Sequence, residues 1–294
     1  MSGLRHNFRR RNLAEQWRIP SLPPCNKTLV MGIVNVTPDS FYDGGRWAAP
    51  EAAIAHARQL RTDGADILDI GGESSRPGAE PVPAGEEMDR VLPVVQALAG
   101  DGVPLSVDTY RAETARRALE AGAAMINDIT ALRGDPYMAG VAAAADCKLV
   151  LMHMRGTPKT MQAAPRYDNV VDDIIAFFEE RMAFAVAGGV REENIWLDPG
   201  FGFGKTPGQN LELLRRLDEF HRLGRPLLLG TSNKSTIGVV LGLSPEERTE
   251  GTAATVAFAA ARGVHCVRVH DVKTMARVVR MCDAIHRGSG WDNE

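Results

Sequence analysis

The sequence has few cysteines, and they are not paired. Only four occur in 294 residues, and no two of them form a C-x-x-C motif. A chain of this length buries enough surface to fold without disulfides or a structural metal. Scattered thiols of this kind are typical of small buried hydrophobic residues in a reducing compartment. The four are Cys25, Cys147, Cys266 and Cys282.

Long hydrophobic runs and an excess of one charge are also missing. No segment approaches the roughly 18 apolar residues of a membrane span, and no signal-peptide core follows the arginines of the first eleven residues. Lys and Arg total 34 against 37 Asp and Glu, a net charge of −3, so no global basic field attracts nucleic acid. We therefore expect a cytoplasmic protein that binds neither membrane nor nucleic acid.

Short apolar runs, each too short for a helix and too continuous for a half-exposed strand, recur along the chain. Such runs are typical of buried parallel strands. Helical patterns separate them, including a predicted helix over 110–121 that ends before Gly122 and an apolar stripe at Leu213, Leu214, Leu217 and Phe220. The longest helical stretch covers about 235–262, and a last helix covers 271–287. The eight runs are 29–34, 67–70, 104–107, 124–129, 148–154, 194–197, 226–229 and 264–269.

Eight strands alternating with helices predict an α/β fold, a single (β/α)₈ TIM barrel. The alternative, an open doubly wound sheet, normally carries G-x-G-x-x-G after its first strand, and here that position reads N-V-T-P-D-S. We expect the barrel at 27–287, an N-terminal extension at 1–26 and a C-terminal tail at 288–294.

Polar residues stand where nearly every predicted strand ends. In a parallel barrel these positions converge on the C-terminal mouth, where barrel enzymes keep their chemistry. One such residue is more often a helix cap, but eight at the same register indicate an enzyme. They are Asn35, Glu73, Asp108, Asn127 with Asp128, His153, Asp198, Ser232 and Arg268 with His270 and Asp271.

Two common enzyme types do not fit. The segment 199–206 (P-G-F-G-F-G-K-T) fails the phosphate-loop spacing because Pro199 stands where glycine is required. A tightly bound zinc is disfavoured because the first strand ends in Asn35 and no His-x-His occurs. A Mg²⁺ bridging a substrate phosphate needs only one or two oxygen ligands and remains open. Phe201 and Phe203 would line an aromatic pocket or pack in the core.

The segment 230–235 (G-T-S-N-K-S) opens a helix directly after the seventh predicted strand. Backbone N–H groups at such a terminus attract an anion, and Lys234 adds a full charge. Three interpretations stay open: a site for a ligand carboxylate or phosphate, an ordinary cap by Ser232 with a solvated lysine, and a Schiff-base lysine.

The motifs at the strand ends together resemble the dihydropteroate synthase family, which joins a pterin diphosphate to 4-aminobenzoate. They occur in family order over residues 31–272. The matching strings are M-G-I-V-N-V-T-P-D-S-F-Y-D-G-G (31–45), D-I-G-G-E-S-S-R-P-G-A (69–79), S-V-D-T (106–109), N-D-I (127–129), L-M-H-M (151–154), D-P-G-F-G-F-G-K-T (198–206), S-N-K-S (232–235) and R-V-H-D-V (268–272).

The resemblance implies a role for each strand end. The pterin ring would be bound by Asp108, Asn127 and Asp198, with Lys234 on its carbonyl side. A carboxylate facing the amino-pyrimidine edge accepts two parallel N–H bonds.

The resemblance also implies where the diphosphate binds. It would lie against Arg268, His270 and Asn35, with Mg²⁺ held between Asn35 and the phosphate oxygens. Catalytic roles thus follow for Asn35, Lys234, Arg268 and His270.

The second substrate, 4-aminobenzoate, would meet Ser235 at the helix start, with its ring near Phe203 and Pro77. Loops 35–46 and 72–80, the latter carrying Ser75 and Arg76, would close over the site. A homodimer is implied by resemblance alone.

Two positions depart from the family pattern. Ser75 replaces the usual threonine and keeps a hydroxyl, whereas Asn233 replaces the arginine of S-R-K-S and removes a charge beside the 4-aminobenzoate pocket. Asn233 supports one alternative to an active synthase, a pterin-binding relative without turnover. A second alternative is a methyltransferase acting on methyl-tetrahydrofolate. Such methyltransferases lack the S-x-R-P-G and R-V-H-D motifs, both of which are present in this chain at 74–78 and 268–271.

Overall fold

The strands and helices alternate along the whole chain in a computed structural model that describes residues 27–37, 45–75, 78–163 and 165–287. The strands are β1 (Leu29–Asn35), β2 (Ile67–Gly71), β3 (Leu105–Asp108), β4 (Met125–Asp128), β5 (Lys148–Met152), β6 (Ile195–Asp198), β7 (Leu228–Leu229) and β8 (Cys266–Val269). The helices are α2 (Gly45–Thr62), α3 (Ala84–Leu98), α4 (Ala112–Ala121), α5 (Met138–Ala145), α6 (Val170–Ala187), α7 (Pro207–Arg215), α8 (Ser235–Leu241), α9 (Thr249–Ala261) and α10 (Val272–Arg287).

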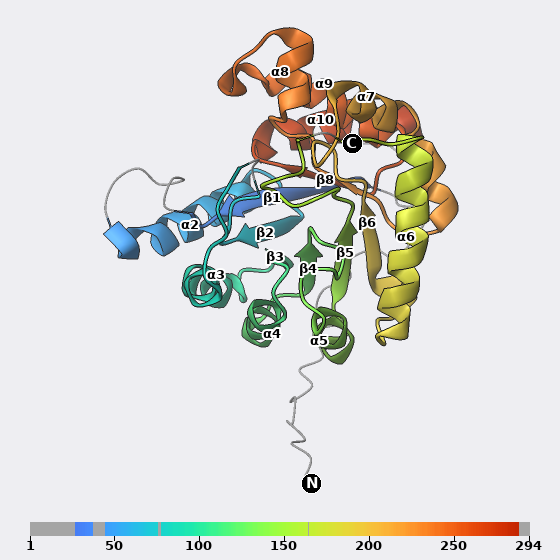
Figure 1. Ribbon diagram of the computed structural model, residues 1–294. Helices are drawn as coiled ribbons and strands as arrows, with labels where there is room; N and C mark the ends of the chain where they lie inside the picture. The colour runs from blue at the N-terminus through green and yellow to red at the C-terminus, as the bar shows by residue number, and fades with distance from the viewer. Residues whose placement is uncertain (1–26, 38–44, 76–77, 164, 288–294) are drawn as a thin grey trace.

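All eight strands are parallel and form one sheet in the order β6-β5-β4-β3-β2-β1-β8-β7. A parallel bridge from Leu197 to Leu227, just before β7, joins the two ends of this order. The helices surround the strands on the outside (Figure 1). The predicted (β/α)₈ barrel is therefore confirmed. The predicted segments 1–26 and 288–294 lie outside the described residues.

Two apolar clusters hold the barrel together. The larger one packs the outward side chains of the strands against the helices. The smaller one consists only of strand residues, from every strand except β3, and fills the barrel interior. Its members are Leu29, Met31, Ile67, Met125, Val150, Trp196, Leu228 and Cys266. Because side chains alternate along a strand, this layer forms a solid floor beneath the mouth.

Two helical predictions need correction. The stretch 235–262 is divided into α8 and α9, because Gly242 takes a left-handed conformation (φ 70°) and ends α8. The stripe at 213–220 begins in α7 but continues as a 3₁₀ helix, Leu217–Leu223. All four residues of that stripe are buried in the core, as the pattern predicts. Gly122 follows α4 with φ 120°, as expected for a helix-terminating glycine.

Candidate active site

Four polar residues form a second layer directly above the apolar floor. Each lies two positions after a floor residue on the same strand, so its side chain points into the barrel as well. They are Asp69 on β2, Asn127 on β4, Asp198 on β6 and Arg268 on β8. Asp108 on β3 joins them, since it pairs in register with Asn127. The mouth of the barrel therefore brings together Asp108, Asn127, Asp198 and Arg268 as predicted.

Arg268 is the centre of an ion-pair network at this level. Its Nε donates to Oδ2 of Asp69 at 2.6 Å, and its Nη2 donates to Oδ2 of Asp108 at 2.9 Å. Asp69 also accepts a hydrogen bond from Nδ2 of Asn127 at 3.0 Å. Four strands, β2, β3, β4 and β8, thus share one chain of contacts, Asn127–Asp69–Arg268–Asp108.

Sequence reasoning missed Asp69. This side chain is fully buried, and its Oδ1 has no hydrogen-bond partner among the residues that the structure describes. The same holds for Oδ1 of the buried Asn127. The signal was a carboxylate inside the apolar run I-L-D-I, a position where an unpaired charge is costly.

Burial raises the proton affinity of two carboxylates in the mouth. It raises the pKa of Asp108 to about 7, with Arg268 opposing the shift and the charges of Asp69 and Glu87 adding to it. It raises the pKa of Asp198 to about 6, opposed by the backbone N–H of Gly200 and the charge of Lys234. Both groups therefore change protonation near neutral pH, which is typical of residues that bind or react with a ligand.

Lys234 and Phe203 lie together beside this layer. The Lys234 Nζ stands 4.0 Å above the centre of the Phe203 ring, a cation–π arrangement. Phe203 packs in a small cluster of methionines and Ile129, whereas Phe201 is buried in the main core. Both phenylalanines are therefore packed in apolar clusters, and the Phe203 ring also contacts the Lys234 amine.

The end of β7 and the end of β8 are linked by one hydroxyl. Ser232 Oγ lies 2.9 Å from Nδ1 of His270 and accepts the backbone N–H of His270 at 3.2 Å. Ser232 is therefore neither a helix cap nor solvated. Ser235 is exposed at the first position of α8.

A buried lysine supports the loop after β6. Lys205 is 2% exposed, and its Nζ donates to the carbonyls of Gly200 (2.8 Å) and Phe203 (3.1 Å) and lies 3.0 Å from Nδ1 of His153. Burial lowers the pKa of Lys205 to about 7, and burial together with the Lys205 charge lowers the pKa of His153 well below its usual value. Gly200 is required here, because its φ is +68° and a Cβ would lie 1.9 Å from the carbonyl oxygen of His153.

Replacing Lys205 with methionine is expected to reduce the free energy of unfolding by about 1–3 kcal/mol, because the buried hydrogen bonds from Nζ to the carbonyls of Gly200 and Phe203 are lost. Urea denaturation at pH 8 measures the loss. The control is Lys159→Met, whose exposed amine contacts Glu80 and whose removal should cost less than about 0.5 kcal/mol. Equal stability of Lys205→Met and the unmodified protein would show that Lys205 does not hold this loop.

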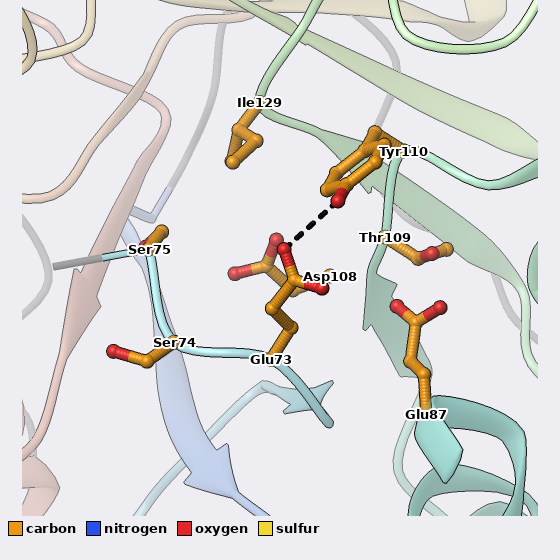
Figure 2. Close-up of a pocket in the computed structure, with 8 residues that line it drawn as sticks. All are labelled: Glu73, Ser74, Ser75, Glu87, Asp108, Thr109, Tyr110 and Ile129. Carbon is orange, nitrogen blue, oxygen red and sulfur yellow. Dashed lines mark hydrogen bonds between the residues drawn. The ribbon is translucent and has the colours of Figure 1, made fainter. Parts of the chain in front are cut away.

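A pocket opens between β2 and β3 at the rim of the mouth (Figure 2). Glu73 lies on one side of it and connects the two ends of the β2–α3 loop. Its carboxylate accepts hydrogen bonds from Tyr110 Oη (2.9 Å), the backbone N–H of Val82 (2.9 Å) and Arg111 Nη2 (2.7 Å). The lining residues are Glu73, Ser74, Ser75, Glu87, Asp108, Thr109, Tyr110 and Ile129.

The remaining predicted residues are only partly described. Asn35 is half-buried at the end of β1, beside Gly71 of β2. Arg76, Pro77 and residues 38–44 lie outside the described residues. Within the described ranges, no three or more His, Cys, Asp and Glu side chains lie together in a way that could hold a metal.

None of the described helices has the length and hydrophobicity that a membrane span requires.

Comparison with known proteins settles the family. Residues 31–270 match the family model described as pterin binding enzyme. Dihydropteroate synthase from Bacillus subtilis is 50% identical over 265 residues, 90% of either chain. The chain belongs to the dihydropteroate synthase family.

Solved structures of the family agree with this assignment. Dihydropteroate synthase of Xanthomonas albilineans with 4-aminobenzoic acid is 45% identical, with a TM-score of 0.84 over 89% of this chain and 94% of that one. The same enzyme in complex with 7,8-dihydropteroate is 43% identical, with a TM-score of 0.81 over 89% and 94%. The eight-stranded architecture is therefore that of the synthase family.

The structure also gives a setting for the residue that departs from the synthase pattern. Asn233 has φ 57°, a left-handed conformation that asparagine tolerates better than arginine does. Its backbone carbonyl accepts a hydrogen bond from Nη1 of Arg248 at 3.0 Å. A guanidinium group therefore does contact this segment, although it comes from the start of α9.

Proposed function

We propose that the protein is a dihydropteroate synthase, which condenses 6-hydroxymethyl-7,8-dihydropterin diphosphate with 4-aminobenzoate to 7,8-dihydropteroate and pyrophosphate in folate biosynthesis. The observation that carries the proposal is the network Asn127–Asp69–Arg268–Asp108 at the mouth of the barrel. This network provides carboxylate acceptors for an amino-pyrimidine. It also provides a guanidinium for a diphosphate. Family relatives that are named as synthases support the same activity.

Pterin recognition is assigned to Asp108, Asn127 and Asp198. A carboxylate accepts two parallel N–H bonds from an amino-pyrimidine edge. Asn127 offers a buried Oδ1 that no described residue contacts by a hydrogen bond, and this acceptor could receive a ligand N–H. Lys234 would serve the carbonyl side of the ring.

Arg268 and His270 are assigned to the diphosphate. The reaction breaks the C–O bond between the pterin methylene and the diphosphate, and the electron pair leaves with pyrophosphate. Arg268 supplies a planar pair of donors and His270 one more, so the negative charge that develops on the leaving group is stabilised. The arylamine of 4-aminobenzoate then bonds to the cationic methylene and loses a proton. The amine is already nucleophilic, so this step requires no strong base.

Mg²⁺ is proposed as the cofactor. The Asn35 side chain provides an amide oxygen, a donor of the hard type that Mg²⁺ prefers, and Mg²⁺ commonly completes its shell with waters and substrate phosphates. Bound there, the ion would neutralise charge on the leaving diphosphate.

The second substrate is assigned to the rim of the mouth. Ser235 would bind the carboxylate of 4-aminobenzoate, and its ring would lie near Phe203 and Pro77. Ser75 and Arg76 belong to a loop that would close over this substrate. Ser75 lines the pocket between β2 and β3, and Phe203 lies under the Lys234 amine.

A cytoplasmic homodimer is proposed as the working form. Within the described part of the chain all cysteines (Cys147, Cys266 and Cys282) are free thiols, as expected in a reducing compartment. The neighbouring helices α8, α9 and α10 expose large apolar side chains that a second copy would cover. These are Val239, Val240, Leu241, Phe258, Met281 and Ile285.

The activity is tested by mixing the purified protein with pterin diphosphate, 4-aminobenzoate and Mg²⁺. We expect pyrophosphate release that depends on 4-aminobenzoate, with one dihydropteroate formed for each pyrophosphate. Pterin binding without release would identify a relative that lacks turnover. Methyl transfer from methyl-tetrahydrofolate in place of release would identify a methyltransferase.

A further inference from the structure

We propose that Asp69 is a positioning residue that fixes the amide orientation of Asn127 and so determines which pterin edge the site accepts. This inference rests on the proposed function, because it assumes that Asn127 binds the pterin. Asp69 itself is 0% exposed and lies in the layer above the floor, where its Oδ2 contacts both Asn127 and Arg268.

The orientation follows from donor and acceptor chemistry. A carboxylate paired with a guanidinium only accepts hydrogen bonds, so it can face only the NH₂ end of an asparagine amide. The Nδ2 of Asn127 lies 3.0 Å from Oδ2 of Asp69, which directs Oδ1 of Asn127 away from Asp69. That oxygen is buried and has no hydrogen-bond partner in the described part of the chain. The contact with Asp69 therefore makes Asn127 present an acceptor oxygen to the site. Without this contact, the amide could present either its oxygen or its NH₂ group.

Arg268 holds Asp69 in this role. Its Nε donates to the same Oδ2 at 2.6 Å, and its Nη2 is held at 2.9 Å from Asp108. The guanidinium therefore provides the counter-charge that a fully buried carboxylate requires. A simple structural role for Asp69, as the ion partner of Arg268, is the competing account.

The two accounts differ in what they predict when the acceptor at position 69 is removed. Asp69→Asn loses the charge, but Arg268 Nε selects the amide oxygen for the Oδ2 position, so Asn127 keeps its acceptor and its orientation. Asp69→Ala leaves no acceptor there, and the Asn127 amide can then present either end to the ligand. If Asp69 acts through Asn127, Asp69→Ala costs no further affinity in a chain that already carries Asn127→Ala. A purely structural ion pair with Arg268 predicts instead that Asp69→Asn loses affinity as Asp69→Ala does, with or without the Asn127 amide.

The test measures the dissociation constant of 6-hydroxymethylpterin, which lacks the diphosphate, for the unmodified chain, Asp69→Asn, Asp69→Ala, Asn127→Ala and the double variant Asp69→Ala with Asn127→Ala. We expect Asp69→Ala to bind about tenfold more weakly or worse and Asp69→Asn to bind nearly as well as the unmodified chain. The double variant should bind as Asn127→Ala does. Thermal denaturation checks that each variant is folded. The control is Asp218→Asn, an exposed carboxylate paired with Arg262, which should not change the dissociation constant.

Should Asp69→Ala not fold, Asp69→Leu, which fills more of the same space without an acceptor, takes its place in both comparisons. The proposal is overturned if Asp69→Asn loses affinity as Asp69→Ala does, or if Asp69→Ala weakens binding further in the Asn127→Ala chain. Pyrophosphate release is followed in parallel. If the unmodified chain binds pterin without turnover, the synthase proposal fails while the Asp69 comparison still stands; if it binds no pterin, both fail.

Discussion

Replacing Arg268 with methionine is expected to lower kcat/KM for the pterin diphosphate by about 100- to 1,000-fold, the usual cost of removing a donor that stabilises charge in a transition state. Methionine has a similar length and packs in apolar surroundings, so the loss reports the guanidinium. Steady-state pyrophosphate release at saturating 4-aminobenzoate measures it.

The same substitution should also destabilise the fold. It leaves Asp69 buried without its counter-charge, and breaking a buried ion pair from one side costs about 3 kcal/mol or more. Urea denaturation separates this effect from catalysis. The matched control is Arg262→Met, which removes an exposed pair with Asp218 and should change neither quantity. Full activity in Arg268→Met would disprove the assignment of Arg268 to the diphosphate.

Replacing Asp108 with asparagine is expected to weaken pterin binding about 100-fold at pH 8.5, because one of two charge-assisted acceptors becomes a donor. The difference should shrink as the pH falls. In the unmodified protein the pKa of Asp108 is raised to about 7, so below that pH the carboxyl is neutral and binds the pterin less well. The unmodified protein then loses up to about tenfold in affinity for each pH unit below 7.

Fluorescence titration with 6-hydroxymethylpterin between pH 5.5 and 8.5 measures both proteins. Asp198, with its pKa raised to about 6, titrates in both and cancels in the ratio of their dissociation constants. Thr109→Ser, beside the same strand end, serves as the control. A ratio that is constant across this range would show that the ionised form of Asp108 is not what binds the pterin.

The barrel could be predicted from the sequence because its strands are local features. Each is a short apolar run, and all eight lie within a few residues of their predicted positions. The predicted positions of Asp108, Asn127, Asp198 and Arg268 followed from the same register, since strand ends in a parallel barrel converge.

The partners of those residues could not be predicted in this way. Arg268 and Asp69 are 199 residues apart, and their contact depends on closure of the ring and on the length of one side chain. Lys205 was assigned to a glycine-rich loop, where a lysine is normally solvated, and only packing under Gly200 and Phe203 buries it. The break between α8 and α9 depends on a left-handed glycine, which a hydrophobic pattern does not distinguish from a helical one.

The two substrates are assigned to parts of the barrel that differ in rigidity. The residues that we assign to the pterin are strand residues seated on a solid floor of side chains such as Trp196 and Met125, where few substitutions fit. The residues that we assign to 4-aminobenzoate, including Ser75 and Ser235, lie on a loop and at a helix start, where substitution is better tolerated. Selection by analogues of the second substrate can therefore act on this rim without disturbing pterin recognition.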